Sequence, residues 1–486
     1  MNYKRIFRKK NIDEMLKAAA KQDLKRTLGA FQLVMLGIGA IVGAGIFVLT
    51  GTAASTSAGP AVVLSFVIGS IACACAAMCY AELASAIPIS GGAYSYTYVT
   101  LGEMAAWLVG SMILVGNTFM ISSVAVGWAG YVSSFFEQFG LMIPYSITHR
   151  IGESMQLTDG TTVSGVCNLL STVIIALSCW ILYKGVETSA VINNIIVVIK
   201  IFVLGSFIII GMFYINPENW IPFIPERIEE TGQFGIAGIF GGAAIVFLAF
   251  NGFDTVASAA QETKNPQRDL PIGVVGSLLV SAIIYILVSG VLTGLVSYKE
   301  LNSPQPMALA VNVMSMPWFA LVVKFGAICG LGSVTLVMTY AVVRIAFTMS
   351  NDGLLPKSLQ TLHPVNKTPH FATIIMCFII GLLSSTAPLD TMVQIGNFCV
   401  IAVFVIVSGM TIYLRYSQPE LKREFKCPLM PAIPTLGIVL FLAFLFNMPN
   451  KNIILYFFGL LFTSATYYLL ARKDESEIVK EVIHTK

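Results

Sequence analysis

VMLGIGAIVGAGIFVLTG, residues Val34–Gly51, is an apolar run crowded with glycines. Its length and composition are typical of a helix that crosses a membrane. Two interpretations of the glycines are open. Small residues let neighbouring helices approach closely, or Gly43-Ala44-Gly45 marks a break that frees backbone amides and carbonyls. Freed backbone at membrane depth is tolerated only where it is buried in protein or lines a cavity.

A second apolar run repeats this theme. It reads GGAAIVFLAFNGFDTVASAAQETKNP (Gly241–Pro266) and is interrupted by Asn251, Gly252 and Asp254. An acid inside a span is functional by default. For Asp254 we favour capping of the second half-helix over ion binding, because a carboxylate suits freed amides. The two interruptions lie five spans apart, and transporters with inverted repeats place broken helices at corresponding positions of their two halves.

Lys200 stands in the apolar segment NNIIVVIKIFVL (Asn193–Leu204), and the nearest charged residues are Glu187 and Glu218. In a helix, Lys200 lies about 20 Å from Glu187, which is further than a lysine side chain can snorkel. Because a charge in lipid is costly, Lys200 is expected to face a protein interior or a wet cavity and to have a function there. The alternative is a buried structural lysine paired with backbone carbonyls.

The composition indicates a polytopic membrane protein. Of 486 residues, 56% are hydrophobic and only 11% are charged, whereas a soluble domain carries about 25% charged residues. The net charge of +4 does not indicate nucleic acid, since the basic residues lie in short segments that resemble loops. The polar and basic residues before the first apolar run are not those of a cleavable signal peptide, so we expect that run to be the first span.

The chain offers little for enzymatic or metal chemistry. Most of its nine cysteines lie in apolar segments, where cysteine is commonly a small hydrophobe, and its four histidines lie outside the apolar runs. We therefore expect no metal, no cofactor and no enzyme. The nucleotide-binding pattern G-x-x-x-x-G-K-[ST] is not found in the chain, which disfavours primary active transport by this chain alone.

Twelve stretches are long enough to cross a membrane as helices. They are 30–57, 61–86, 104–136, 166–184, 188–214, 235–262, 271–297, 317–348, 370–387, 391–414, 432–448 and 452–471. With the N-terminus inside, 23 lysines and arginines lie in inner segments and 4 in outer segments, with Lys200 and Lys324 left in spans. This bias predicts that both termini are cytoplasmic, in a plasma membrane.

The two breaks suit a zwitterion. Amides at the start of a half-helix attract a carboxylate, and freed carbonyls at the end of the other half-helix attract an ammonium. An amino acid carries both groups on one carbon. Backbone groups would therefore recognise the part that all amino acids share, while side chains would recognise the variable part.

Several of these motifs resemble one known family. The segments are GIGAIVGAGIFVLTG (Gly37–Gly51), YAELASAIPISGGAYSYTYVTLGE (Tyr80–Glu103), NNIIVVIKIF (Asn193–Phe202), NGFDTVASAAQETKNPQRDLPIG (Asn251–Gly273) and MSNDGLLP (Met349–Pro356). Together they are similar to the amino acid–polyamine–organocation superfamily. Within it, they most resemble bacterial members of the cationic amino acid transporter family. The resemblance covers roughly residues 25–415.

The resemblance implies an all-α LeuT-like fold with twelve transmembrane helices, of which helices one and six are discontinuous. Ten helices would form an inverted 5+5 repeat, and two would be peripheral. The implied divisions are a basic tail 1–29, helices one to five in 30–214, helices six to ten in 235–414, a cytoplasmic loop 415–431, helices eleven and twelve in 432–471 and a tail 472–486.

The resemblance also implies a site. The expected substrate-binding residues are Ile41, Gly43, Ala44, Gly45 and Ile46 of helix one, Leu248, Ala249 and Asn251 of helix six, and Leu331 of helix eight. In sodium-independent relatives a lysine on helix five takes the place of a sodium ion, and Lys200 matches it. A desolvated ammonium binds its proton less tightly, so Lys200 is the candidate for proton coupling. Gly252 and Asp254 are expected to shape and cap the break.

Two departures from the family bear on the substrate. Relatives that recognise cationic substrates often carry a glutamate in helix three, whereas the corresponding stretch LVGNTFM (Leu114–Met120) has Gly116 there. Asn251 is polar in a stretch that is usually apolar, and it would bind either a polar substrate side chain or the freed backbone. The missing acid argues against cationic substrates, and the apolar Leu248, Ala249 and Leu331 suit branched-chain or other neutral amino acids, which are the expected substrates.

The leading hypothesis is a sodium-independent, proton-coupled importer that works by alternating access at the bacterial plasma membrane. The alternatives are an amino acid exchanger, a cationic amino acid transporter and a nutrient sensor, the last disfavoured by the short tail 472–486. The expected partners are the amino acid, the proton and membrane lipid, without nucleic acid. A small membrane partner subunit is not readable from the sequence.

Overall fold

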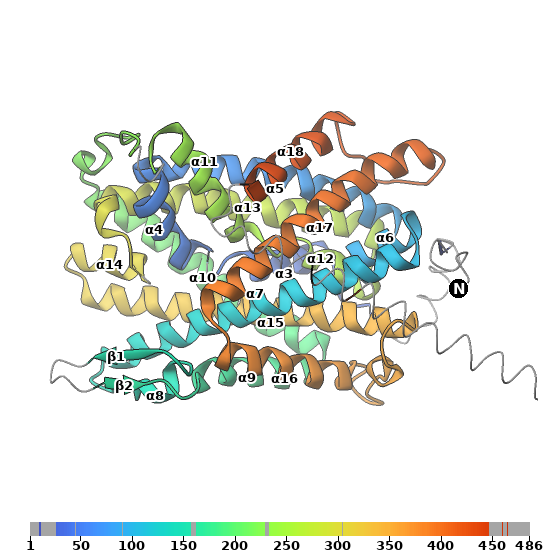
Figure 1. Ribbon diagram of the computed structural model, residues 1–486, viewed down its shortest axis with the longest axis horizontal. Coiled ribbons are helices and arrows are strands. Elements are labelled where there is room, and N and C mark those ends of the chain that lie inside the picture. The colour runs from blue at the N-terminus through green and yellow to red at the C-terminus, as the bar shows by residue number, and fades with distance from the viewer. Residues whose placement is uncertain are drawn as a thin grey trace, which may run out of the picture.

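The computed structural model describes residues 9–10, 26–43, 45–89, 91–156, 162–228, 233–303, 305–446, 459 and 464. Over these residues the chain is mostly helical, and its long helices run along the long axis of the molecule (Figure 1). A short antiparallel hairpin pairs β1 (Ser154–Gln156) with β2 (Thr162–Ser164), so that Ser154 lies opposite Ser164.

Seven apolar helical stretches among the described residues are long enough to cross a membrane. They are Ala30–Ala86, Glu103–Glu137, Thr188–Tyr214, Gly235–Ser258, Pro266–Leu295, Pro317–Asn351 and Thr391–Ser417. The first of them contains two of the predicted spans. Three shorter apolar helices, α9 (Leu169–Lys184), α16 (His370–Thr386) and α18 (Ala432–Phe446), coincide with predicted spans four, nine and eleven. The predicted span 452–471 lies almost wholly outside the described residues, as do most of 1–29 and all of 472–486.

Helix boundaries follow local sequence signals. Helices α13 (Pro266–Leu295), α14 (Pro306–Val313) and α15 (Pro317–Asn351) each begin with proline, which has the right φ and lacks an amide that would be unpaired there. Asn168 caps α9 by accepting a hydrogen bond from the Ser171 amide at 3.1 Å. The sequence thus fixes where these helices start.

The other helical elements either form parts of these spans, as α5, α7, α10 and α17 do, or connect them. They are α5 (Val62–Ala86), α6 (Ala93–Thr100), α7 (Glu103–Glu137), α8 (Tyr145–Thr148), α10 (Val186–Gly211), η4 (Met212–Tyr214), η5 (Pro217–Trp220), η8 (Tyr298–Glu300), η9 (Lys357–Gln360) and α17 (Leu389–Ser417). Helix α6 lies in the segment 86–103 and is buried, and its Tyr94 hydroxyl donates to Asp352 at 2.7 Å. Two segments that resemble the family thus meet in space.

Two of the long stretches are interrupted. Helix α3 (Ala30–Ile41) ends before Val42, and helical structure resumes with the π-helical turn η1 (Gly45–Leu49), followed by α4 (Thr50–Ala53), η2 (Ala54–Ala58) and η3 (Gly59–Ala61). Helix α11 (Gly235–Val246) continues as the 3₁₀ turn η6 (Phe247–Phe250), and residues 251–254 separate it from α12 (Thr255–Ser258) and η7 (Ala260–Glu262). These interruptions fall where glycine and polar residues break the apolar pattern.

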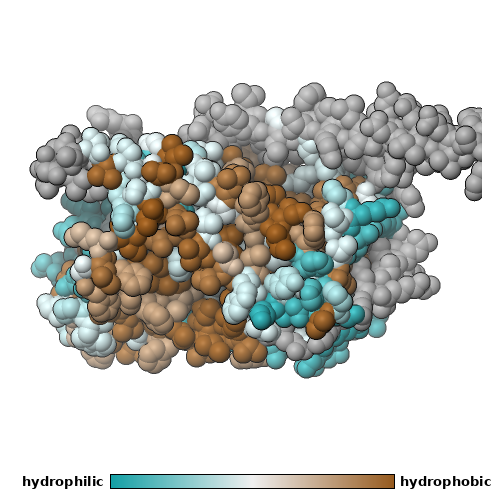
Figure 2. Space-filling view, turned by 90° about the horizontal axis from the view of Figure 1, so that it is seen from below, coloured by the Kyte–Doolittle hydropathy of each residue, from teal (hydrophilic) through white to brown (hydrophobic). Residues whose placement is uncertain are grey.

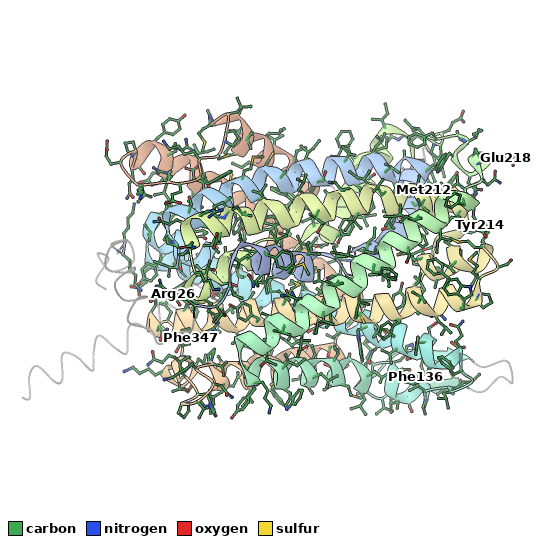
Figure 3. All side chains as sticks on the ribbon, turned by 180° about the vertical axis from the view of Figure 1, so that it is seen from behind. Arg26, Phe136, Met212, Tyr214, Glu218 and Phe347 are labelled. Atoms are coloured by element: carbon green, nitrogen blue, oxygen red, sulfur yellow. The ribbon has the colours of Figure 1, made fainter. Side chains whose placement is uncertain are left out.

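The two ends of the bundle are distinct. Figure 3 shows Arg26, just before α3, at the same end as Phe347 near the end of α15. Phe136, Met212, Tyr214 and Glu218 lie at the opposite end (Figure 3). Helices α7 and α10 therefore run away from the Arg26 end, and α15 runs back towards it. The end of the bundle that holds Arg26 and Phe347 is called the Arg26 end below.

One long face of the bundle is apolar in its middle part. Figure 2 shows hydrophobic residues spread across one long face, with hydrophilic residues gathered towards the ends. Large side chains such as Phe202, Phe213 and Phe378 are 72%, 83% and 72% exposed. So many exposed apolar side chains would be a liability in water, and they suit a lipid environment.

Helix α18 packs on the second interrupted helix. Its Phe441 ring lies 5.4 Å from Phe247 of η6 and 5.6 Å from Phe404 of α17, measured between ring centroids. Phe444 of the same helix lies 5.7 Å from Phe247. This helix, which the resemblance places at the periphery, therefore contacts the element that leads into the break.

Candidate functional site

Lys200 reaches the end of α3. Its side chain is fully buried, and its Nζ lies 2.9, 3.2 and 2.9 Å from the carbonyl oxygens of Ile38, Gly39 and Val42 and 2.9 Å from Ser333 Oγ, so that its three hydrogens are shared among four acceptors. The last carbonyls of a helix have no partner within the helix and carry partial negative charge. Charged donors make the stronger hydrogen bonds. These contacts match the carbonyl-paired alternative for Lys200, and its role in proton coupling stays a prediction.

Two further side chains support this contact. Ser333 of α15 donates to the Gly39 carbonyl at 3.1 Å, and Asn193 Nδ2 donates to the Met35 carbonyl at 3.1 Å. A side chain on Gly39 would collide with the Asn193 amide, so glycine is needed there. We did not single out either residue from the sequence. Asn193 lies two helical turns before Lys200 and therefore on the same face, a signal that was available.

Tyr285 of α13 connects the two interruptions. Its buried hydroxyl lies 2.8 Å from the Ile41 carbonyl at the end of α3 and 2.9 Å from the Ala249 carbonyl in η6. Its ring packs against Phe66 and Phe250, with centroid distances of 5.6 and 5.1 Å. The sequence gives no warning of this role, because a tyrosine in an apolar run is an ordinary amphipathic residue.

The backbones of the two breaks touch each other. A Cβ on Gly45 would overlap Ala249, and a Cβ on Gly252 would lie 2.8 Å from Ala40 Cβ. Gly252 also has φ +124°, a conformation that other residues rarely adopt. The structure therefore brings Gly45 and Ala249 of the predicted substrate-binding set into direct contact, and Gly252 joins them from the second break.

The remaining predicted residues surround this contact. Ile46 and Leu331 are fully buried, and Leu248 is half-buried. A Cβ on Gly330, beside Leu331, would lie 2.8 Å from the Phe47 ring of η1, and one on Gly43 would overlap Val334. Helix α15 thus packs on the first break. Ala44 lies outside the described residues.

The two polar residues of the second break differ in their partners. Asn251 is 4% exposed, and neither its Nδ2 nor its Oδ1 has a hydrogen-bond partner. Of the two alternatives for Asn251, the bond from its side chain to freed backbone is thus not formed. Burying an amide without a partner costs about 2 kcal/mol or more. Asp254 occupies the N-cap position of α12, as expected, without a side-chain capping hydrogen bond to that helix, and its carboxylate lies near the backbone amides of Gly252 and Thr255.

Asp254 also borders a small cavity between α7 and α17. Asn117 and Cys399 line the same cavity, together with apolar side chains. Its size admits about one water molecule. One residue before Asn117, a Cβ on Gly116 would lie 2.5 Å from Cys399 Cβ. Helix α17 therefore fills the space that an acid at position 116 would need.

At the Arg26 end, backbone hydrogen bonds and an ion pair join the segments that flank the two interrupted helices. The amides of Thr27 and Leu28 donate to the Glu262 carbonyl at 2.9 and 3.0 Å, and the Lys264 amide donates to the Leu28 carbonyl at 2.8 Å. The Glu262 carboxylate pairs with Arg344 of α15, and both are buried. The segment before α3 is thus tied to the segment after α12, which the sequence did not predict.

The chain has several apolar helices of membrane-spanning length. Two of them are interrupted, the interruptions are in contact, and a buried ammonium lies at one of them. This is the architecture of a membrane transporter. The chain belongs to the amino acid permease family, which it matches over residues 28–470. The family resemblance read from the motifs is thereby confirmed.

Three relatives show the range of this similarity. The chain is 42% identical over 470 residues to the branched-chain amino acid permease BcaP of Bacillus subtilis (strain 168), covering 96% of this chain and 98% of the relative. It is 39% identical over 468 residues to the methylthioribose transporter of the same organism, with the same coverage. It is 34% identical to the vacuolar cationic amino acid transporter 4 of Arabidopsis thaliana, over 85% of this chain and 68% of the relative.

Proposed function

We propose that this protein imports neutral amino acids, branched-chain ones foremost, by alternating access. The observation that carries the proposal is the meeting of two interrupted helices, with the carbonyls of Ile41 and Ala249 turned towards one hydroxyl between them. Such carbonyls suit a substrate ammonium, and the amides at the start of η1 suit its carboxylate. The similarity to a branched-chain amino acid permease supports the same class of substrate.

The surroundings of the breaks support a neutral side chain. Ile46, Leu248 and Leu331 are apolar, and Gly116 packs against Cys399, which leaves no room for an acid at position 116. A cationic substrate would need a buried counter-charge, because an unpaired charge in the protein interior is strongly unfavourable. A cationic amino acid transporter is therefore the weaker alternative.

We assign the chain a LeuT-like arrangement of twelve helices, with 30–214 and 235–414 as inverted repeats. One interruption lies between α3 and η1 and the other between η6 and α12. Their separation of five predicted spans supports this assignment. The placement of Arg26 and Phe347 at one end, opposite Phe136 and Tyr214, supports the predicted alternation of spans (Figure 3). The excess of basic residues on one side supports cytoplasmic termini.

Lys200 is the group we propose for proton coupling without sodium. Its ammonium holds three carbonyls at the end of α3. A neutral amine would lose the charge that strengthens these bonds. The protonation state of Lys200 would therefore change how strongly its side chain binds the carbonyls at the end of α3. This gives a physical route by which a proton changes the position of α3 during transport.

The second candidate substrate is a hydroxyl-bearing one. The buried Asn251 amide without partners favours a ligand that donates or accepts hydrogen bonds, and one relative is a methylthioribose transporter. A hydroxyl on the substrate would supply the missing partner. The observation that favours this candidate is thus the unpaired amide of Asn251, the residue that also departs from the apolar pattern.

A competition panel in proteoliposomes tests these proposals. Uptake of labelled leucine would be measured at two pH values against each unlabelled proteinogenic amino acid and against methylthioribose. We expect valine and isoleucine to compete strongly and lysine and arginine weakly. Strong competition by methylthioribose alone would favour the second candidate. Counterflow with and without a pH gradient separates import from exchange, since an exchanger needs no gradient.

A further inference from the structure

The Tyr285 hydroxyl has one hydrogen for two acceptors. It lies 2.8 Å from the Ile41 carbonyl and 2.9 Å from the Ala249 carbonyl. A hydroxyl donates one hydrogen bond, and a carbonyl can only accept. One of these two buried carbonyls is therefore only partly satisfied at any moment. A group with two or more hydrogens could donate a hydrogen bond to each of the two carbonyls.

The Ile41 carbonyl differs from the other freed carbonyls of the first break. Lys200 already supplies the carbonyls of Ile38, Gly39 and Val42 with a charged donor. Ile41 turns to Tyr285 instead, and so does Ala249 across the gap. An ammonium carries three hydrogens, and the zwitterion of the proposed function would bring one to this place.

The hydroxyl is held in position by its own ring. Phe66 of α5 and Phe250 of η6 pack on the ring, and Tyr285 is fully buried. Helix α13 is itself packed tightly on α3, since a Cβ on Gly273 would lie 2.8 Å from Leu33 Cβ. Tyr285 is thus held in closely packed surroundings on α13, whereas the Ala249 carbonyl belongs to a different element, η6.

We propose that the Tyr285 hydroxyl substitutes for the substrate ammonium in the empty transporter and is displaced from at least one carbonyl when substrate binds. This inference rests on the proposed function, because it takes a zwitterion to be the ligand of the two breaks. With Tyr285 in place, the empty protein can bring its breaks together without leaving both carbonyls unpaired. Net import requires that step, because the empty transporter must return. Exchange does not, because substrate occupies the site in both directions.

The test compares net uptake with exchange in the Tyr285→Phe variant. Purified full-length protein is placed in liposomes that are empty or loaded with unlabelled leucine, and the initial uptake of labelled leucine is measured. We expect net uptake to fall about tenfold, the effect of one lost buried hydrogen bond on the return step. We expect exchange to stay within about twofold of the wild type, with an unchanged or lower KM. Tyr285→Met, which also lacks the hydroxyl, should show the same split if the phenylalanine variant does not fold.

Tyr131→Phe is the matched control. Tyr131 is also buried and donates to one carbonyl of the first interrupted helix, that of Phe47, at 2.7 Å. Because this hydroxyl serves one acceptor outside the break, its loss should change both transport modes by the same factor. Equal losses of net uptake and exchange in Tyr285→Phe, or a raised KM for exchange, would overturn the inference alone. A wild type that takes up no amino acid in either mode would overturn the proposed function and the inference with it.

Discussion

The two interruptions satisfy their freed backbone in opposite ways. At the first, Lys200, Ser333 and Asn193 donate to carbonyls of α3 from two neighbouring helices. At the second, the described residues supply no cation, and the Asn251 amide stands unpaired. The Tyr285 hydroxyl, shared with the first break, serves the Ala249 carbonyl.

This difference separates a fixed region from an adaptable one. Breaking the contacts of a buried charge is strongly destabilising, so the end of α3 moves only when Lys200 changes its contacts or its charge. The second break has fewer bonds to lose, and its unpaired amide gains from a new partner. Substrate and protein motion should therefore act most readily on the second break, while the first break sets when that motion is allowed.

The largest effect is expected for Lys200→Ala. It removes the charged donor from three buried carbonyls, and we expect it to abolish proton-driven leucine accumulation and to lower the free energy of unfolding by about 2–4 kcal/mol. Uptake in proteoliposomes with an imposed pH gradient and thermal unfolding in detergent measure the two effects. Lys324→Ala is the matched control, because Lys324 is also within a span but donates to one carbonyl, that of Ser134, at 3.2 Å.

Retained pH dependence in Lys200→Ala would remove the coupling role from this residue. Loss of stability without loss of pH dependence would leave Lys200 as a structural anchor of α3. The control should keep both its accumulation and its response to pH. A similar defect in Lys324→Ala would show that any lysine in a span has the effect.

A smaller effect is expected for Gly252→Ala at the second break. The added Cβ would meet Ala40, and the backbone at φ +124° is unfavourable for alanine. Strain of about 1–3 kcal/mol corresponds to about a tenfold loss in uptake rate. Initial leucine uptake measures it, with Gly409→Ala of α17 as the control, since a Cβ there meets nothing within 4 Å. Unchanged uptake in Gly252→Ala would mean that the two breaks need no close contact.

Much of this architecture could be predicted from the sequence. The predicted span 235–262 has the limits of α11 to η7, and the first span begins at Ala30 as predicted. Apolar runs of this length form helices in lipid because their backbone must pair internally. Glycine and polar residues inside them mark where that pairing fails. Composition and the lengths of the apolar runs were therefore enough for the spans and interruptions that fall in the described residues.

The partners across the interruptions could not be predicted. Tyr285 and Ser333 carry no charge, and nothing local distinguishes them from other polar residues in apolar helices. Their roles depend on which helices pack together, as does the pairing of Glu262 with Arg344. Lys200 was found because a charge in lipid is costly, and an uncharged hydroxyl gives no such signal.

The smallest effect, and the sharpest test of the comparison, is expected for the asparagines of the two breaks. Asn251→Leu removes an amide that has no partner, so it should raise the free energy of unfolding by about 1 kcal/mol. Asn193→Leu removes a donor to the Met35 carbonyl and should lower it by a similar amount, about 1 kcal/mol. If Asn251 serves a hydroxyl-bearing substrate, its variant should also reduce threonine uptake relative to valine by about tenfold, because the two side chains are nearly isosteric. Destabilisation of both variants would mean that Asn251 has a partner in the membrane, and the second break would then be as fixed as the first.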